Sequence, residues 1–144
     1  MSIKPFWQRP LPLMLLLIAA AGCESGSPDL APARGRILFR DVPLHTGTIV
    51  FTPDSLRGTT GPSARGNILP DGTYVLETDD KAGAVPGWHR VTIVAMDSAF
   101  SSGSGGQFVV PRSLLPDKYR DPEQSGLVCE IKAGQENCID LNLD

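Results

Sequence analysis

Residues 70–94 read PDGTYVLETDDKAGAVPGWHRVTIV, and they contain the clearest strand pattern of the chain. Asp71 and Gly72 predict a tight turn, because these residue types readily adopt the backbone angles that turns need. We expect one strand over residues 73–78 and a second over residues 88–94, with a Gly/Ala-rich crossing between them.

The two expected strands each carry apolar side chains at every second position. Side chains two residues apart in a strand share a face, so Tyr74 lies with Leu76 in the first strand and Val91 with Ile93 in the second. This period of two indicates a sheet with one buried face.

The composition limits the class of protein. The chain has 144 residues, 41% of them hydrophobic and 6% aromatic, with 15 Gly and 13 Pro. Gly and Pro at this density are typical of a single domain with many turns and argue against a helical bundle. The net charge is −3 and no basic stripe is present, so nucleic acid is not an expected partner.

The first 22 residues have the pattern of an export signal. Lys4 and Arg9 form a positive region, and residues 11–21 (LPLMLLLIAAA) form an uncharged apolar run that ends in small residues. A run of this length is shorter than the roughly 20 residues of a membrane-spanning helix. Two alanines and a glycine precede Cys23, which resembles the lipobox of bacterial lipoproteins. The resemblance implies cleavage before Cys23 and a diacylglyceryl group on its thiol, the nucleophile that lipid transfer needs. An ordinary cleaved signal is the alternative.

The residues after Cys23 indicate where the protein is attached. In proteobacterial lipoproteins an aspartate at the next position favours the inner membrane, so Glu24 implies, by resemblance, a lipid-anchored protein of the outer membrane facing the periplasm. Residues 23–33 are small, polar and proline-containing, and we expect a flexible tether there. The folded domain is expected over residues 34–144.

That domain is expected to be all-β. Residues 108–122 contain three prolines and predict extended coil, with at most one helical turn at residues 113–115. About seven short strands predict an antiparallel β-sandwich. The expected strands cover residues 36–40, 47–52, 64–69, 73–78, 88–94, 127–132 and 137–143.

Several segments carry a family resemblance. They are RDVPL (40–44), GTIVFTP (47–53), GNILPDGTYVLET (66–78), AGAVPGWHRVTI (82–93), LPDKYRDPEQSGL (115–127) and IKAGQEN (131–137), together with Gly35, Ile37 and Phe39. They resemble small planctomycete-type lipoproteins with a carboxypeptidase-regulatory-like, or transthyretin-like (prealbumin-like), domain. The resemblance implies a seven-stranded Greek-key β-sandwich and no settled activity.

No catalytic, metal or cofactor site is predicted. The branch of the transthyretin-like fold that hydrolyses 5-hydroxyisourate ends in Tyr-Arg-Gly-Ser, whereas this chain ends in LNLD. His45 and His89 have no cysteine or carboxylate beside them at ligand spacing. Residues 79–81 (DDK) are expected to be a solvated turn rather than a calcium loop. Ser125 is not in a nucleophile elbow.

A sugar-binding platform is the alternative to a purely structural role. Tyr74 and Trp88, with the Ser/Gly-rich loop of residues 98–106, are the candidate contacts, because aromatic faces commonly pack on ligands. Core or edge packing is the competing interpretation of both aromatic residues.

Cys129 and Cys138 form the expected disulfide, since an exported protein with its third cysteine lipidated retains an even pair. A two-residue turn at residues 133–134 would place the two cysteines opposite each other. The apolar alternation instead favours a loop of odd length, which would send them to different faces, and a bulge at Gly134 would reconcile the two patterns. Two separate thiols are the alternative.

These observations predict a non-enzymatic, lipid-anchored envelope protein whose β-sandwich is a structural or binding module. A carbohydrate-binding accessory protein is the alternative function. The expected partners are the membrane, through Cys23, and an envelope protein or glycan that the sequence does not identify.

Overall fold

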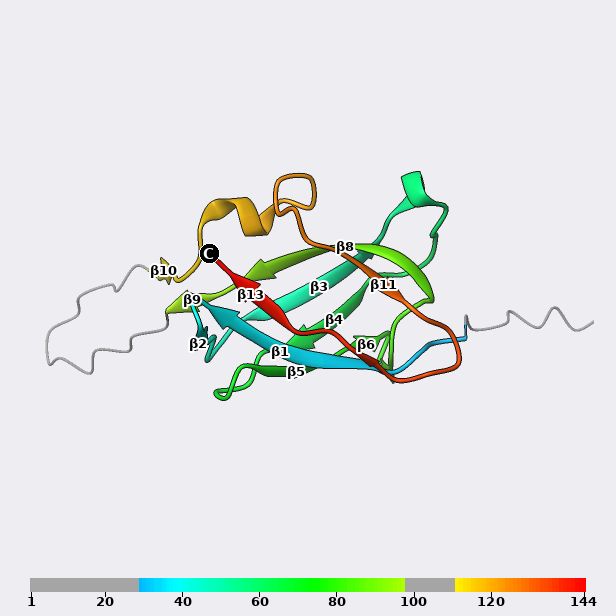
Figure 1. Ribbon diagram of the computed structural model, residues 1–144, viewed down its shortest axis with the longest axis horizontal. Coiled ribbons are helices and arrows are strands. Elements are labelled where there is room, and N and C mark those ends of the chain that lie inside the picture. Colours follow the sequence, from blue (N-terminus) through cyan, green and yellow to red (C-terminus); the bar gives the residue numbers. More distant parts are fainter. Residues whose placement is uncertain (1–28, 98–110) are drawn as a thin grey trace, which may run out of the picture.

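The computed structural model describes residues 29–97 and 111–144. These residues form short strands and two 3-10 helices, so the all-β prediction is confirmed (Figure 1). Cys23 and the loop of residues 98–106 lie outside the described residues. Within the described part, no helix is long and apolar enough to cross a membrane.

The larger sheet is antiparallel and has the strand order β11-β8-β3-β4-β6-β7. At its centre the two longest strands pair in register from Thr48 opposite Val94 to Pro53 opposite His89. The predicted alternation is present, because His89, Val91 and Ile93 are buried and the residues between them are partly exposed. The strands are β3 (Thr48–Pro53), β4 (Ala64–Asn67), β6 (Glu77–Thr78), β7 (Lys81–Ala82), β8 (Gly87–Val94) and β11 (Val128–Ile131).

The second sheet is built around β1 (Ala33–Phe39) and is mixed rather than antiparallel. Two C-terminal strands, β12 (Asn137–Cys138) and β13 (Leu141–Leu143), pair with β1 in parallel. On the other side, β2 (Val42–Pro43) and β5 (Thr73–Val75) pair with β1 antiparallel. The antiparallel prediction is therefore wrong for the chain end, because β12 reaches β1 by a crossover from the larger sheet instead of through a hairpin.

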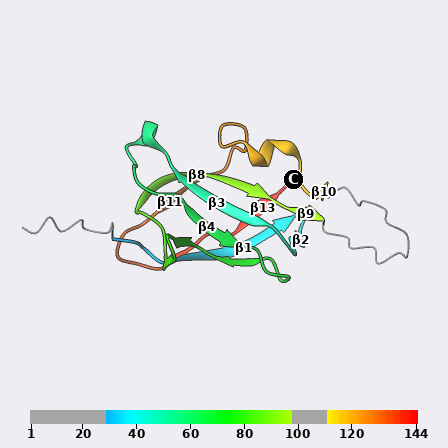
Figure 2. The same cartoon turned by 180° about the vertical axis from the view of Figure 1, so that it is seen from behind.

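The two sheets enclose one apolar core, and Figure 2 shows β1 and β13 passing across the strands of the larger sheet. Phe51 and Tyr74 meet in this core with ring centroids 6.4 Å apart. Ala31 and Ala33 are also buried, and Ala31 bridges Ala84. The folded body thus begins a few residues before residue 34, and the end of the expected tether belongs to it.

The predicted strand over residues 73–78 changes sheet at Leu76. Its first half, β5, pairs with β1, and its second half, β6, pairs with β4 only through Arg65 opposite Glu77. Leu76 donates its backbone N–H to Ala33 at 2.9 Å and buries its side chain. The two strands predicted on either side of the Asp71–Gly72 turn thus belong mainly to different sheets, β4 to the larger one and β5 to the second.

The helical turn of the proline-rich segment lies at η2 (Asp117–Arg120), after Pro116, and not at residues 113–115. Residues Arg112–Ser113 form instead a short strand, β10, that pairs with β9 (Met96–Asp97). Extended backbone before a proline is the favoured conformation, which moves the turn beyond it. Tyr119 in η2 is buried and donates its hydroxyl to the Asp144 carboxylate at 2.7 Å.

Gly35 provides a test of how closely β1 approaches the segment between β12 and β13. A methyl group at Gly35 would overlap the backbone carbonyl of Ile139, whereas a methyl group at Gly58 would meet no atom within 4 Å. We expect Gly35→Ala to lower the free energy of unfolding by about 3 kcal/mol or more through overpacking. Gly58→Ala should cost only about 1 kcal/mol, from its left-handed backbone. Urea unfolding followed by circular dichroism measures both, and equal losses would contradict this packing.

Candidate functional site

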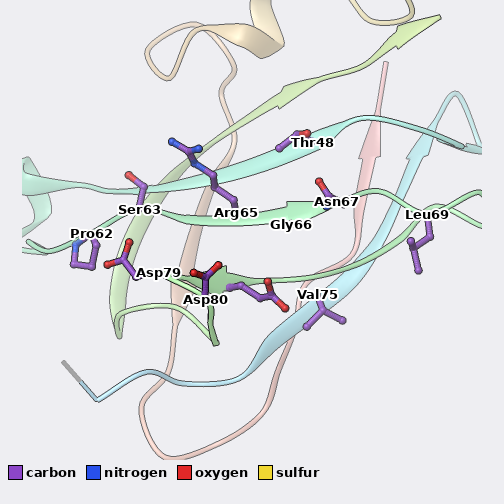
Figure 3. A pocket seen from close by; sticks show the side chains of 11 residues that line it. Thr48, Pro62, Ser63, Arg65, Gly66, Asn67, Leu69, Val75, Asp79 and Asp80 are labelled. Atoms are coloured by element: carbon purple, nitrogen blue, oxygen red, sulfur yellow. The ribbon is translucent and has the colours of Figure 1, made fainter. Parts of the chain in front are cut away.

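The candidate binding site is an open groove of about 920 Å³ on the outer surface. It forms along β4 where β5 leaves to join the other sheet, and both strands contribute lining residues. Figure 3 shows Arg65 and Thr48 on one side of the groove and Val75 with the Asp79–Asp80 turn on the other. Its size lies within the range of known ligand pockets. It is lined by Thr48, Pro62, Ser63, Arg65, Gly66, Asn67, Leu69, Val75, Glu77, Asp79 and Asp80.

The charged side chains of the groove have unused hydrogen-bonding capacity. Among the described residues, no hydrogen bond or ion pair engages the side chain of Arg65, Glu77, Asp79 or Asp80. They carry both signs of charge, with an acidic excess, and they border an apolar patch in which Val75 is 55% exposed. The groove can therefore offer donors, acceptors and apolar contact to one ligand.

The two aspartates at one end of the groove lie in a tight turn between β6 and β7. Asp79 and Asp80 have positive φ values of 47° and 63°, as in the two-residue hairpins that join twisted strands. Thr78 secures the turn by donating its hydroxyl to the Gly83 carbonyl at 2.8 Å. Asp79 and Asp80 thus form the predicted turn, and Lys81 begins β7. No group of three or more His, Cys, Asp or Glu in the described ranges is placed to hold a metal ion.

The two aromatic candidates do not form a shared platform. Tyr74 is 1% exposed and donates its hydroxyl to the Ile139 carbonyl at 2.7 Å, so it cannot contact a sugar. Trp88 lies on the outer face, half-buried, with the Arg57 guanidinium 4.9 Å from its ring centroid. Neither residue lines the groove.

Asp54 is a polar residue that sequence reasoning missed. It is 4% exposed, caps η1 (Ser55–Arg57) by accepting from the Leu56 N–H, and pairs with Arg57 at 3.4 Å and Arg90 at 3.3 Å. Asp before a short helical turn is a recognisable cap signal, but its pairing with Arg90 on β8 is not visible in the sequence.

Ser125 and His45 provide no catalytic chemistry. Ser125 is buried, and its hydroxyl accepts the Leu127 N–H at 3.3 Å. His45 is exposed, and neither residue has a base or nucleophile at hydrogen-bond distance in the part of the chain that the structure describes.

Cys129 and Cys138 are free thiols, and the hairpin that was expected to join them does not form. Cys129 lies on β11 of the larger sheet and Cys138 on β12 beside β1, because the chain crosses between sheets at residues 132–137. Asn137 stabilises this crossover: its side chain accepts from the Lys132 N–H at 2.8 Å and donates to the Lys132 carbonyl at 3.0 Å.

Cys129 instead lies opposite His89 in the β11–β8 pair. Burial raises the pKa of the Cys129 thiol. His89 is fully buried beside Phe51, at a centroid distance of 6.0 Å, and burial lowers its pKa although its Nδ1 bond to the Gly87 carbonyl opposes the shift. Both groups are thus favoured in their neutral forms, which does not suit a thiolate–imidazolium nucleophile.

Comparison with known proteins identifies no family. No protein-family model and no curated protein matches the chain. A crystal structure of a 9R-lipoxygenase from Cyanothece is similar with 17% identity and a TM-score of 0.41. The match covers 82% of this chain and 17% of that enzyme. Similarity at this level supports no conclusion about fold or activity.

The buried imidazole predicts a pH-dependent stability. Because the folded pKa of His89 lies below the ordinary value of 6.5, the unfolded chain binds a proton that the folded chain does not. The free energy of unfolding should therefore fall as the pH decreases below about 6.5, by up to about 1.4 kcal/mol per pH unit from this group. His89→Gln should flatten this part of the curve, and His45→Gln, at an exposed position, should leave it unchanged. Chemical unfolding from pH 7.5 to 5 measures the slope, and an unaltered slope in His89→Gln would refute the assignment.

Proposed function

We propose that the protein is a non-enzymatic, lipid-anchored binding module of a bacterial cell envelope, with the groove between β4 and β5 as its contact surface. The anchor is Cys23, and Glu24 after it favours the outer membrane, with the domain facing the periplasm. The observation that carries the binding role is the set of unpaired charged side chains around one groove.

Support for the anchor comes from the sequence. A positive region, a short apolar run and small residues end at Cys23, and a thiol directly after them is what lipid transfer requires. Residues that follow are polar and contain proline, and they give the domain some reach from the membrane surface.

Support for a non-enzymatic role comes from the chemistry of the side chains. Catalysis by a nucleophile needs an activating base within hydrogen-bond reach. Among the described residues, Ser125 is engaged by backbone, and the Cys129 thiol and the His89 imidazole are both favoured neutral.

The groove favours a polypeptide partner over a glycan. Sugars are commonly bound on exposed aromatic faces, and the groove has no aromatic lining residue. Its mixed charges, its amide at Asn67 and its exposed Val75 suit the alternating polar and apolar side chains of a protein segment. Trp88 with Arg57 is the remaining surface for a glycan, and it lies apart from the groove.

The anchor is tested by replacing its thiol. We expect the mature wild-type protein to remain with the outer-membrane fraction and to begin with a lipidated Cys23, because a thioether-linked diacylglyceryl group together with an acylated amine holds a protein stably in the bilayer. Cys23→Ser should release the domain or leave the signal uncleaved. Mass spectrometry of the N-terminal peptide provides the readout, and an unmodified Cys23 in the wild type would refute the anchor.

The groove is tested by photocrosslinking in intact cells. A photoreactive side chain at position 67, inside the groove, should capture a specific envelope protein, whereas the same side chain at position 130, on edge strand β11, should not. The double change Asp79→Asn with Asp80→Asn retains residue types that tolerate the left-handed turn. It should weaken capture about tenfold, from two lost charge contacts.

Three results would count against this function. Capture at both positions would show a non-specific surface, and capture unaffected by the double change would separate binding from the groove. Retention of one sugar class on a glycan array, lost in Trp88→Ala, would favour the carbohydrate-binding alternative.

A further inference from the structure

His89 has the environment of a metal-ligating histidine. Its Nδ1 lies 3.0 Å from the Gly87 carbonyl. Because a carbonyl only accepts, Nδ1 carries the proton and Nε2 presents a bare lone pair. Nε2 is buried and has no hydrogen-bond partner. A ring N–H donated to a backbone carbonyl is the arrangement that fixes the tautomer of most metal-bound histidines, and a buried polar atom without a partner needs an explanation.

The thiol of Cys129, a soft metal ligand, belongs to the residue opposite His89 on the neighbouring strand β11. Cys129 is the register partner of His89, and it packs on the same inner face because it belongs with buried Ile131 to the inward row of β11. Side chains at opposite positions of an antiparallel pair have Cβ atoms about 4.5–5.5 Å apart. Cys129 is partly exposed, so an ion can reach its sulfur from outside.

We infer that Cys129 Sγ and His89 Nε2 form a two-ligand site for a soft monovalent metal ion, Cu(I) or its analogue Ag(I). Thiolate and imidazole are ligands that Cu(I) accepts. Two metal–ligand bonds of about 2.0–2.3 Å span roughly 4 Å, which lies within reach of two opposite side chains whose Cβ atoms are about 5.5 Å apart.

The charge of the site and its number of ligands argue against Zn²⁺ as the bound ion. One thiolate and one neutral imidazole neutralise a monovalent ion, so the loaded site carries no net charge into the apolar interior. Zn²⁺ would leave one positive charge uncompensated and would require three or four protein ligands. The described residues contain no third His, Cys, Asp or Glu grouped with this pair.

Binding is an exchange of ions without redox change. The metal–sulfur bond forms as the Cys129 S–H bond breaks, and one proton leaves to the solvent. His89 contributes the Nε2 lone pair and releases no proton, since that nitrogen carries none. The copper must arrive already reduced.

The site is tested by competition for Cu(I) under anaerobic conditions. The full-length protein, purified in detergent, is titrated against bicinchoninate-bound Cu(I). We expect one Cu(I) per chain, and Cys129→Ser should lower the affinity at least about 100-fold, because loss of a ligand exceeds the 10–100-fold effect of its surroundings. Cys138→Ser is the matched control and should remain within about twofold. Zn²⁺ should not compete.

X-ray absorption of the wild-type protein tests the site even if the variants do not fold. X-ray absorption of the wild-type Cu(I) protein should give one sulfur and one imidazole nitrogen ligand, and His89→Gln, if folded, should lose the nitrogen signal and at least about tenfold in affinity. Four results would each overturn the inference. The protein could fail to bind Cu(I), or bind it equally well in Cys129→Ser. Absorption could instead show two sulfur ligands that are lost in Cys138→Ser, or Zn²⁺ could displace Cu(I). None of these results depends on the proposed role of the groove.

Discussion

The Tyr74 side chain spans β1 and ties β5 to the segment between β12 and β13, and the arrangement of the second sheet follows from this contact. The Tyr74 ring crosses the core beside Phe51, and its hydroxyl donates to the Ile139 carbonyl next to the C-terminal strands. Gly35 and Gly66 leave the room for this crossing, because a side chain at either position would meet the backbone or the ring. Burial, with added repulsion from the nearby Cys129, Asp140 and Cys138, raises the pKa of Tyr74, so the hydroxyl remains a donor.

The groove follows from the same crossing. Tyr74 holds β5 against β1, while Glu77 two residues beyond Val75 belongs to β6 of the larger sheet. The chain between them must change sheets, so β4 keeps only the pairing of Arg65 with Glu77 on this flank. Charged and polar side chains gather there because the flank is open to water. The candidate binding surface is thus a consequence of how one extended segment is shared by two sheets.

The register of His89 with Cys129 is a feature that local sequence does not reveal. The two residues are far apart along the chain, so no ligand spacing connects them. The register of β11 on β8 places them opposite each other, and the inward alternation of both strands turns them toward the same core. The hairpin assumed for the predicted disulfide does not form, because β11 and β12 pair with strands of different sheets. Asn137, with its side chain bonded across the crossover, directs these strands to different sheets.

Local sequence determined the elements that depend on near neighbours. The alternation at Val91 and Ile93 determined the buried face of β8, prolines and glycines determined that the described body is all-β, and Asp54 could have been recognised as a cap. Tertiary packing set three further features: the parallel pairing of β1 with β12 and β13, the division of residues 73–78 between two sheets, and the register that places His89 opposite Cys129. The physical reason is that a strand's alternation specifies which side of it is apolar, whereas its choice of neighbour is decided by packing among residues distant in the chain.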